Sequence, residues 1–264
     1  MELAQVPSEI VGEPEEYMTY VHGEAGTGKT TWLAGAEGHY IAQTERGTKG
    51  VQVYGSDVSS WEEFIELCKA LKEAKENNWG GQREVRVIGI DTYDMLYAYG
   101  GDWVCRNTKF IDKGVSKSYD RIEDVPWGRG YRRTSDLLIT TLNKLHHVGF
   151  GLILLGHTQG RMVQWRGQEM TKWGLGLSPT ANDAIVAACD AVAYFCIEEE
   201  NEKERGSGDI VTVSQKRLMY WQPQFLRVAK HRLRGFPELL EVDRETGWDD
   251  YSRTFKETYQ NEVN

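Results

Sequence analysis

The chain reads Gly23-Glu24-Ala25-Gly26-Thr27-Gly28-Lys29-Thr30 directly after residues 17–22, a short segment rich in apolar and aromatic side chains. This octapeptide matches G-x-x-x-x-G-K-[ST], the phosphate-binding loop (P-loop) that joins a strand to a helix. Its glycines allow a tight turn in which successive backbone N–H groups face phosphate oxygens. Residues 17–22 suit the preceding strand and residues 31–36 suit the start of the helix. The pattern therefore predicts a nucleoside-triphosphate site.

Each residue of the loop has an expected role. We expect Lys29 to reach the β- and γ-phosphates, and the Thr30 hydroxyl to hold Mg²⁺. The rest of the loop, together with Thr31 just after it, is expected to contact the nucleotide through backbone groups. The sequence thus predicts ATP and Mg²⁺ as cofactors, with all of residues 23–31 in the nucleotide-binding set.

Composition describes an ordinary soluble protein. The 264 residues suffice for one α/β domain with a full core, and 40% are hydrophobic and 27% charged. No apolar run approaches the roughly 20 residues that cross a bilayer, and the acidic N-terminus lacks a secretion signal. The four cysteines form no C-x-x-C pair, so we expect no zinc site. These features favour a cytoplasmic protein that does not contact membranes.

Charge is distributed unevenly around a net value of −9. Residues 1–25 carry six acids and no Lys or Arg, and residues 235–264 carry eight acids and three bases. By contrast, residues 214–234 carry six bases and no acid, and residues 106–133 carry eight bases and four acids. Local positive surface inside an acidic protein suits an anionic partner, although ordinary solvated faces produce the same counts.

Periodicity predicts alternating helices and buried strands. Further strands are expected at residues 39–43, 84–91, 151–155 and 191–197, and helices at residues 59–77, 128–147, 181–189 and 248–260. Residues 100–127 are expected to be a polar loop, 159–180 a loop or hairpin, and 198–208 an exposed turn. Short strands are expected at 210–213, 218–221, 225–229 and 239–242.

This pattern predicts an α/β fold: a mostly parallel, doubly wound P-loop sheet with helices on both faces and a C-terminal β extension. We divide the chain into an acidic N-terminal extension (1–16), an ATPase core (17–243) and an acidic C-terminal helix or tail (244–264).

A second set of residues completes the predicted nucleotide site. Asp91 ends the apolar strand at 84–91 and is expected to hold the Mg²⁺ water shell, although a simple strand-ending Asp fits the same pattern. Thr92 follows it, where many P-loop ATPases have a catalytic Glu. Glu45, just after the strand at 39–43, is the best candidate to orient the attacking water, with an ordinary surface Glu as the alternative. His157 and Gln159, after the strand at 151–155, are both candidates to sense the γ-phosphate.

Together these features resemble the RecA-like ATPase family. In that family a P-loop is followed by a strand ending in a catalytic Glu, a strand ending in Asp-Ser/Thr, and a strand ending in a polar sensor. The resemblance implies that Lys230 and Arg232, which share one face of a late basic strand, reach the ATP of a neighbouring subunit. A solvated strand edge with charges that prevent aggregation fits those two residues as well.

Within this family the chain is most similar to phage proteins of the Sak-four type, which anneal single-stranded DNA and are usually filed as AAA family ATPases. The resemblance implies a homo-oligomer (ring or filament), single-stranded DNA as partner, a single-strand-binding protein as a further partner, and the host cytoplasm as location. It implies DNA contacts from segments 100–133 and 159–180, where cations alternate with aromatic residues. The expected DNA-binding residues are Arg129, Arg132, Arg133, Arg161, Trp165, Arg166 and Lys172.

Two other functions fit the sequence. A small-molecule or nucleotide kinase also combines a P-loop with arginines, and Arg161 and Arg166 could belong to its lid. A helicase loader or accessory protein uses ATP as an assembly switch. For the two segments expected to contact DNA, the alternative is that their tryptophans pack them onto the domain.

Overall fold

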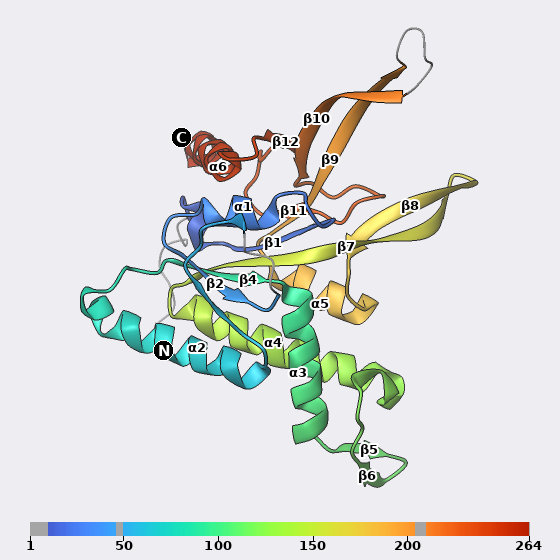
Figure 1. The fold of residues 1–264 in the computed structure, drawn as a ribbon. Coiled ribbons are helices and arrows are strands. Elements are labelled where there is room, and N and C mark those ends of the chain that lie inside the picture. The colour runs from blue at the N-terminus through green and yellow to red at the C-terminus, as the bar shows by residue number, and fades with distance from the viewer. Residues whose placement is uncertain (1–9, 46–49, 204–209, 264) are drawn as a thin grey trace.

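The strand that precedes the P-loop, β1 (Met18–Gly23), lies in the middle of a mixed sheet that runs through the molecule (Figure 1). The computed structural model describes residues 10–45, 50–203 and 210–263. Within them the strand order is β12-β10-β9-β1-β7-β4-β2-β3, while β8 pairs with β7 and β11 with β9. The other strands of this sheet are β2 (His39–Gln43), β3 (Gly55–Asp57), β4 (Val87–Asp91), β7 (Gly151–Trp165), β8 (Gln168–Leu175), β9 (Ala191–Lys203), β10 (Ile210–Tyr220), β11 (Lys230–His231) and β12 (Leu239–Val242).

Strand direction divides the sheet into two parts. The strands from β9 through β1, β7, β4 and β2 to β3 are all parallel to their neighbours. On the other side of β9, β10 is antiparallel to both β9 and β12, and β11 is antiparallel to β9. The predicted parallel core with a C-terminal β extension is therefore confirmed.

Helices cover both faces of the sheet, because the side chains of its buried strands alternate between two apolar clusters. One cluster joins Tyr20 and Leu154 of the strands to α2, α3, α4 and α5. The opposite cluster joins Val21 and Leu155 to α1 and α6, and it contains Trp221 and Phe236. The helices are α1 (Lys29–Ala34), α2 (Trp61–Glu76), α3 (Tyr93–Asn107), α4 (Arg129–His147), α5 (Pro179–Ala188) and α6 (Gly247–Val263).

The C-terminal helix α6 packs directly behind the P-loop helix. Its Trp248 ring lies 4.9 Å from that of Trp32 in α1, and its Tyr251 ring stacks 4.7 Å from that of Trp221. Both α6 residues are buried. The part of the chain expected as a C-terminal helix or tail thus contributes to the core. None of the helices that the structure describes is long and apolar enough to span a membrane.

Strand register brings the predicted site residues to one edge of the sheet. Gly23 at the end of β1 pairs with His157, and Asp91 at the end of β4 pairs with Leu155 and with Gln43 at the end of β2. Because parallel strands end at the same edge, the P-loop, the residues after β2, and Asp91 all converge there.

Several expected boundaries were wrong. Residues 198–203, expected to begin an exposed turn, continue β9, and the strands expected at 210–213 and 218–221 are one strand, β10. Residues 225–229 form no strand and make only isolated bridges through Arg227. Residues 100–107 belong to α3, and the rest of the expected loop contains a hairpin of β5 (Phe110–Asp112) and β6 (Val115–Lys117). The segment 159–180 is a hairpin, β7 with β8, followed by the start of α5.

Candidate nucleotide-binding site

The P-loop closes around the Lys29 side chain. Lys29 Nζ donates hydrogen bonds to the carbonyl oxygens of Gly23 (3.0 Å) and Glu24 (2.8 Å), and the residue is only 7% exposed. Burial lowers the pKa of Lys29, and nearby carboxylates, led by Asp91, oppose that change. Gly26 and Gly28 adopt φ values of 84° and 106°, which L side chains rarely tolerate. The glycines therefore allow the tight turn of the loop, and the hydrogen bonds of Lys29 stabilise it.

Thr30 and Asp91 lie side by side. The Thr30 hydroxyl donates to Asp91 Oδ2 at 2.7 Å, which joins the P-loop helix to the end of β4. Burial raises the pKa of Asp91, while the Thr30 hydrogen bond and the Lys29 charge lower it. A hydroxyl and a carboxylate at this spacing are the oxygen donors that Mg²⁺ prefers when phosphates and water complete its shell. The residues present thus fit the expected Mg²⁺.

Glu45 lies beside this pair. Its Oε1 accepts a hydrogen bond from the Thr92 hydroxyl at 3.0 Å, and the Thr92 backbone N–H donates to Thr44 Oγ1 at 2.7 Å. These bonds tie the residues after β2 to those after β4. Thr92 occupies the position after Asp91 where many P-loop ATPases have a catalytic Glu. Here its hydroxyl positions Glu45, which follows the neighbouring strand β2.

The two sensor candidates are in different environments. His157 lines the same pocket as Lys29 and Glu45, whereas Gln159 is exposed beyond it and accepts from Arg161 Nη2 at 3.4 Å. Asp94 Oδ2 accepts from the His157 backbone N–H at 2.7 Å and lies 2.9 Å from His157 Nδ1. This hydrogen bond raises the pKa of His157. Of the two, the geometry favours His157, held by Asp94 from the first turn of α3.

These residues enclose a pocket of about 320 Å³ at the carboxyl edge of the sheet. Two further cations line it, Arg217 from β10 and Arg244 from the turn after β12. Sequence reasoning missed both, because their approach depends on how the C-terminal extension pairs with β9. It also missed Asp94, although its place one turn after the strand-ending Asp91 was a usable signal. The full lining is Ala25, Gly26, Gly28, Lys29, Thr30, Thr31, Glu45, Val51, Asp91, Thr92, His157, Arg217 and Arg244.

Lys230 and Arg232 lie near the opposite edge of the sheet, where Lys230 pairs with Val192 at the start of β9. Lys230 Nζ donates to the carbonyl oxygens of Val186 (2.9 Å) and Cys189 (2.7 Å), at the C-terminal end of α5. Arg232 forms an ion pair with Asp190. In this chain both cations thus hold the end of α5, a favourable place for positive charge.

The expected DNA-binding residues fall into two structural groups. Arg129, Arg132 and Arg133 form the first turns of α4, the helix expected at residues 128–147, so the end of segment 100–133 is helical rather than a loop. Arg129 donates to the carbonyl oxygens of Pro126 and Ile111 and so fastens the preceding segment, whereas Arg132 and Arg133 are exposed.

The second group lies on the β7–β8 hairpin. Arg161 donates to the Leu177 carbonyl oxygen at 3.0 Å. Trp165 stacks on Phe225 with ring centroids 3.8 Å apart, and Arg166 and Lys172 lie over those two rings. Part of this aromatic surface therefore packs within the molecule, and Phe225 remains 42% exposed.

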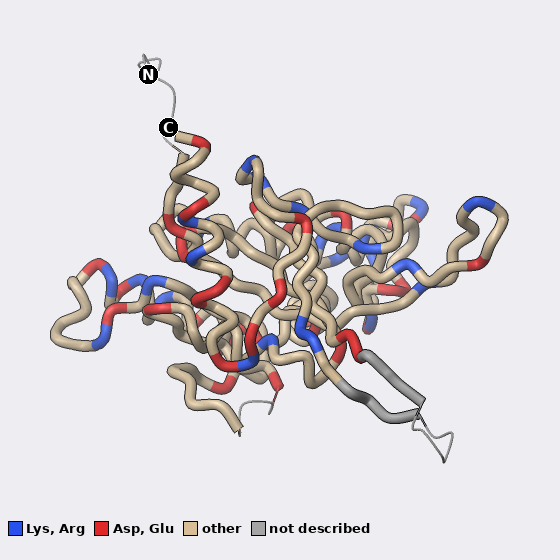
Figure 2. The backbone as a smooth tube through the Cα atoms, turned by 90° about the horizontal axis from the view of Figure 1, so that it is seen from above, with Lys and Arg blue, Asp and Glu red and all other residues tan. Residues whose placement is uncertain are grey.

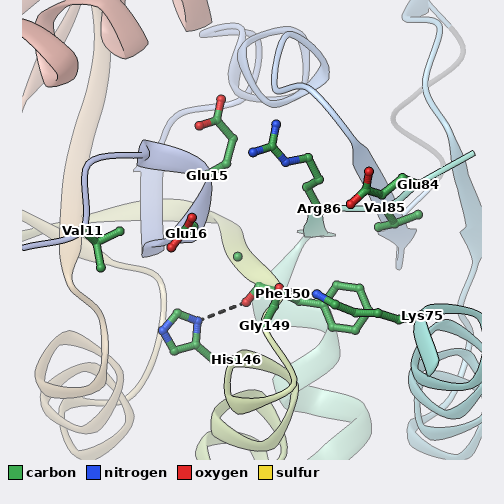
Figure 3. A pocket seen from close by; sticks show the side chains of 11 residues that line it. Val11, Glu15, Glu16, Lys75, Glu84, Val85, Arg86, His146, Gly149 and Phe150 are labelled. Atoms are coloured by element: carbon green, nitrogen blue, oxygen red, sulfur yellow. Dashed lines mark hydrogen bonds between the residues drawn. The ribbon is translucent and has the colours of Figure 1, made fainter. Parts of the chain in front are cut away.

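A second hollow, of about 280 Å³, lies at the amino ends of β4 and β7 (Figure 3), the opposite edge of the sheet from the P-loop. Three carboxylates line it, those of Glu15, Glu16 and Glu84, together with Lys75, Arg86 and His146. His146 Nδ1 lies 3.1 Å from the Phe150 carbonyl oxygen (Figure 3). Its three carboxylates outnumber Lys75 and Arg86, whereas the lysine and arginines of the P-loop pocket outnumber its two carboxylates, so the P-loop pocket is more favourable for a polyphosphate.

Comparison with known proteins identifies the family of the chain. No curated protein matches the chain. A solved structure described as "Crystal structure of the RadB recombinase" is similar over 89% of this chain and 90% of that chain, at 14% identity and a TM-score of 0.44. The protein-family model described as "AAA domain" matches residues 15–233, which include every strand of the parallel sheet and the whole P-loop. The chain therefore belongs to the AAA domain family and has an α/β P-loop NTPase fold.

Proposed function

We propose that this protein is a RecA-like ATPase that binds single-stranded DNA and promotes its annealing, with ATP held at the boundary between subunits of a homo-oligomer. The observation that carries the ATPase part is the convergence of Lys29, the Thr30–Asp91 pair and Glu45 in one pocket. Lys29 would hold the phosphates, Thr30 and Asp91 would hold the metal, and Glu45 would orient the attacking water and accept its proton. Mg²⁺ would neutralise phosphate charge during the transfer.

Contact between the two basic segments supports the DNA part. Arg121 and Tyr131 of the first segment line a hollow of about 350 Å³ with Leu177 and Ser178 of the second. Asp94, Asp102 and Glu123 line it too, so the cations outside this hollow, rather than its lining, would contact a phosphate backbone. Trp127, beside Arg129, is 93% exposed, an uncommon state for so large an apolar side chain. Figure 2 shows Lys and Arg at the tips of projecting loops. Exposed cations with an exposed aromatic ring suit a phosphate backbone and unpaired bases.

Asp94 offers a physical connection between nucleotide and DNA. Its carboxylate bonds His157 in the nucleotide pocket, and the same residue lines the hollow between the two basic segments. A change at the γ-phosphate that moves His157 therefore alters the hydrogen bonding of a residue in that hollow. This arrangement supports coupling of ATP turnover to DNA binding.

Steady-state ATP hydrolysis with and without single-stranded DNA, at two salt concentrations, tests the proposal. We expect DNA to stimulate turnover, and the stimulation to fade at the higher salt concentration because neutralised phosphates release counterions. Lys29→Ala should abolish turnover. Arg132→Gln combined with Arg133→Gln should weaken stimulation, whereas Arg253→Gln on α6 should not. Hydrolysis indifferent to DNA would overturn the DNA part and favour a kinase or a partner-dependent switch.

The oligomer makes a separate prediction. If Lys230 reaches the ATP of a neighbouring subunit, Lys230→Ala should lower turnover while the monomer keeps its nucleotide affinity. Because Lys230 also holds the end of α5, the variant's melting temperature must be measured alongside. Unchanged turnover in a folded variant removes the role in trans and leaves the helix contact as the function of Lys230.

A further inference from the structure

A cation of the C-terminal β extension, Arg217, lies next to the P-loop. Arg217 lies on β10, which pairs with β9, and β9 in turn pairs with β1. Its Nε lies 3.9 Å from the position that a Cβ atom on Gly28 would occupy. Arg217 also lines the nucleotide pocket. The guanidinium group is therefore placed over the turn of the loop that meets the phosphates.

Arg217 has an unused donor at this place. Its Nε is buried and has no hydrogen-bond partner among the described residues. A charged N–H group that loses water without gaining an acceptor is unfavourable, so such groups normally have a partner. Phosphate oxygens are suitable acceptors for a guanidinium group, which presents several donors in one plane.

A second arginine approaches from the turn between β12 and α6. Asp243 Oδ1 accepts hydrogen bonds from the backbone N–H groups of Glu245 (2.7 Å) and Thr246 (3.3 Å). This closed turn presents Arg244, which is exposed and lines the mouth of the same pocket. The Arg217 and Arg244 side chains thus reach the pocket from two adjacent parts of one extension.

We infer that Arg217 and Arg244 bind phosphate oxygens of the nucleotide from within the same chain, an inference that rests on the P-loop pocket being the ATP site of the proposed function. P-loop backbone groups hold the α- and β-phosphates. Arg217 lies over Gly28 in that loop, so its contact is with phosphates that ATP and ADP share. Nucleotide binding then links the parallel core to the C-terminal β extension.

This position distinguishes Arg217 from a γ-phosphate sensor. Loss of a sensor affects ATP and hydrolysis, whereas loss of Arg217 weakens ATP and ADP binding alike. A hydrogen bond to a charged group corresponds to roughly a tenfold to hundredfold change in affinity. Arg217→Lys should recover part of the loss, because it keeps the charge without the planar fork.

The test is titration of ATP and ADP into the full chain with Mg²⁺, by calorimetry, for wild type, Arg217→Gln, Arg217→Lys and Arg244→Gln. Arg234→Gln, an exposed change of the same charge in the same extension, is the matched control. We expect Kd to rise roughly tenfold or more for both nucleotides in Arg217→Gln and less in Arg244→Gln, and to stay unchanged in the control. Melting temperatures without nucleotide show whether each variant is folded.

Wild-type affinity for both nucleotides in Arg217→Gln and Arg244→Gln overturns the inference. Weakened ATP binding with unchanged ADP binding overturns the assignment to the shared phosphates. The result is different if the proposed function is wrong. In that case single-stranded DNA leaves ATP hydrolysis unchanged, whatever the nucleotide affinities of the variants are. If the wild-type chain binds neither nucleotide, both proposals are wrong.

Discussion

The role of Glu45 as a general base can be tested by replacing its carboxylate with an amide of the same shape. Glu45→Gln keeps an oxygen that accepts from the Thr92 hydroxyl, but the amide cannot take a proton from water. We expect ATP binding to remain near wild type and turnover to fall roughly a hundredfold or more, the usual contribution of a general base. Calorimetric ATP binding and steady-state hydrolysis check the two parts separately.

The control for this prediction is Glu24→Gln, which removes the same charge from an exposed residue of the P-loop. A comparable fall in both variants would show that the loss of negative charge, rather than proton transfer, is responsible. Unchanged turnover in Glu45→Gln would mean that another group orients the water.

His157 should give the protein a pH-dependent contribution to stability. The Asp94 hydrogen bond raises the pKa of His157, while burial and the Lys29 charge lower it and Glu45 adds to the rise. A raised folded-state pKa favours the folded protein at low pH. That contribution is complete below about pH 6.5, the ordinary value for His, and is lost as pH rises through the folded-state pKa.

His157→Asn therefore should lower the free energy of unfolding more at pH 6 than at pH 8.5. Because the His157 side chain is 43% exposed, the difference is expected to be small. Urea unfolding of both proteins at the two pH values measures it. A difference that is the same at both pH values would mean that the His157–Asp94 contact is not an ion pair.

At the scale of single elements, the start of α2 depends on two serines. The Ser60 hydroxyl accepts from the Glu63 backbone N–H at 3.2 Å, and Glu63 Oε2 accepts from the backbone N–H and the hydroxyl of Ser59. Ser60→Ala removes the N-cap of a 16-residue helix. We expect the free energy of unfolding to fall by about 1 kcal/mol.

Chemical denaturation measures this change, with Ser116→Ala in the exposed strand β6 as the matched control. An unchanged midpoint in Ser60→Ala would mean that the Glu63 contacts with Ser59 are sufficient to cap the helix.

Element prediction worked where the signal was local. The P-loop and the strand at 151–155 were predictable because glycine spacing and a continuous apolar run are short-range patterns. The end of β9 was missed because residues 198–203 are almost all charged and project from the body with β10, so no apolar face marks them as a strand (Figure 1). The positions of Arg217 and Arg244 were unpredictable for a different reason: they follow from strand pairing between distant segments.

At the scale of the whole molecule, two histidines join the C-terminal segment to the core, His22 buried and His231 half-buried. His22, at the end of β1, lies 2.8 Å through Nε2 from the Val228 carbonyl oxygen, and His231 stacks on Phe236 at 3.9 Å. Burial lowers the pKa of each to about 4. Both are therefore neutral in the folded protein at pH values where they are protonated in the unfolded chain.

The last prediction concerns acid stability. Between pH 6.5 and about 4 the unfolded state binds more protons at His22 and His231, so the free energy of unfolding falls as pH falls through that window. A shift of this size corresponds to a loss on the order of 3 kcal/mol for each group.

His22→Gln should be less stable at pH 7.5 but should lose less stability on acidification. His147→Gln, on an exposed part of α4, should follow the wild-type profile. Urea unfolding at several pH values from 7.5 to 4.5 gives the slopes, and a His22→Gln slope equal to that of wild type would show that folding does not lower the pKa of His22.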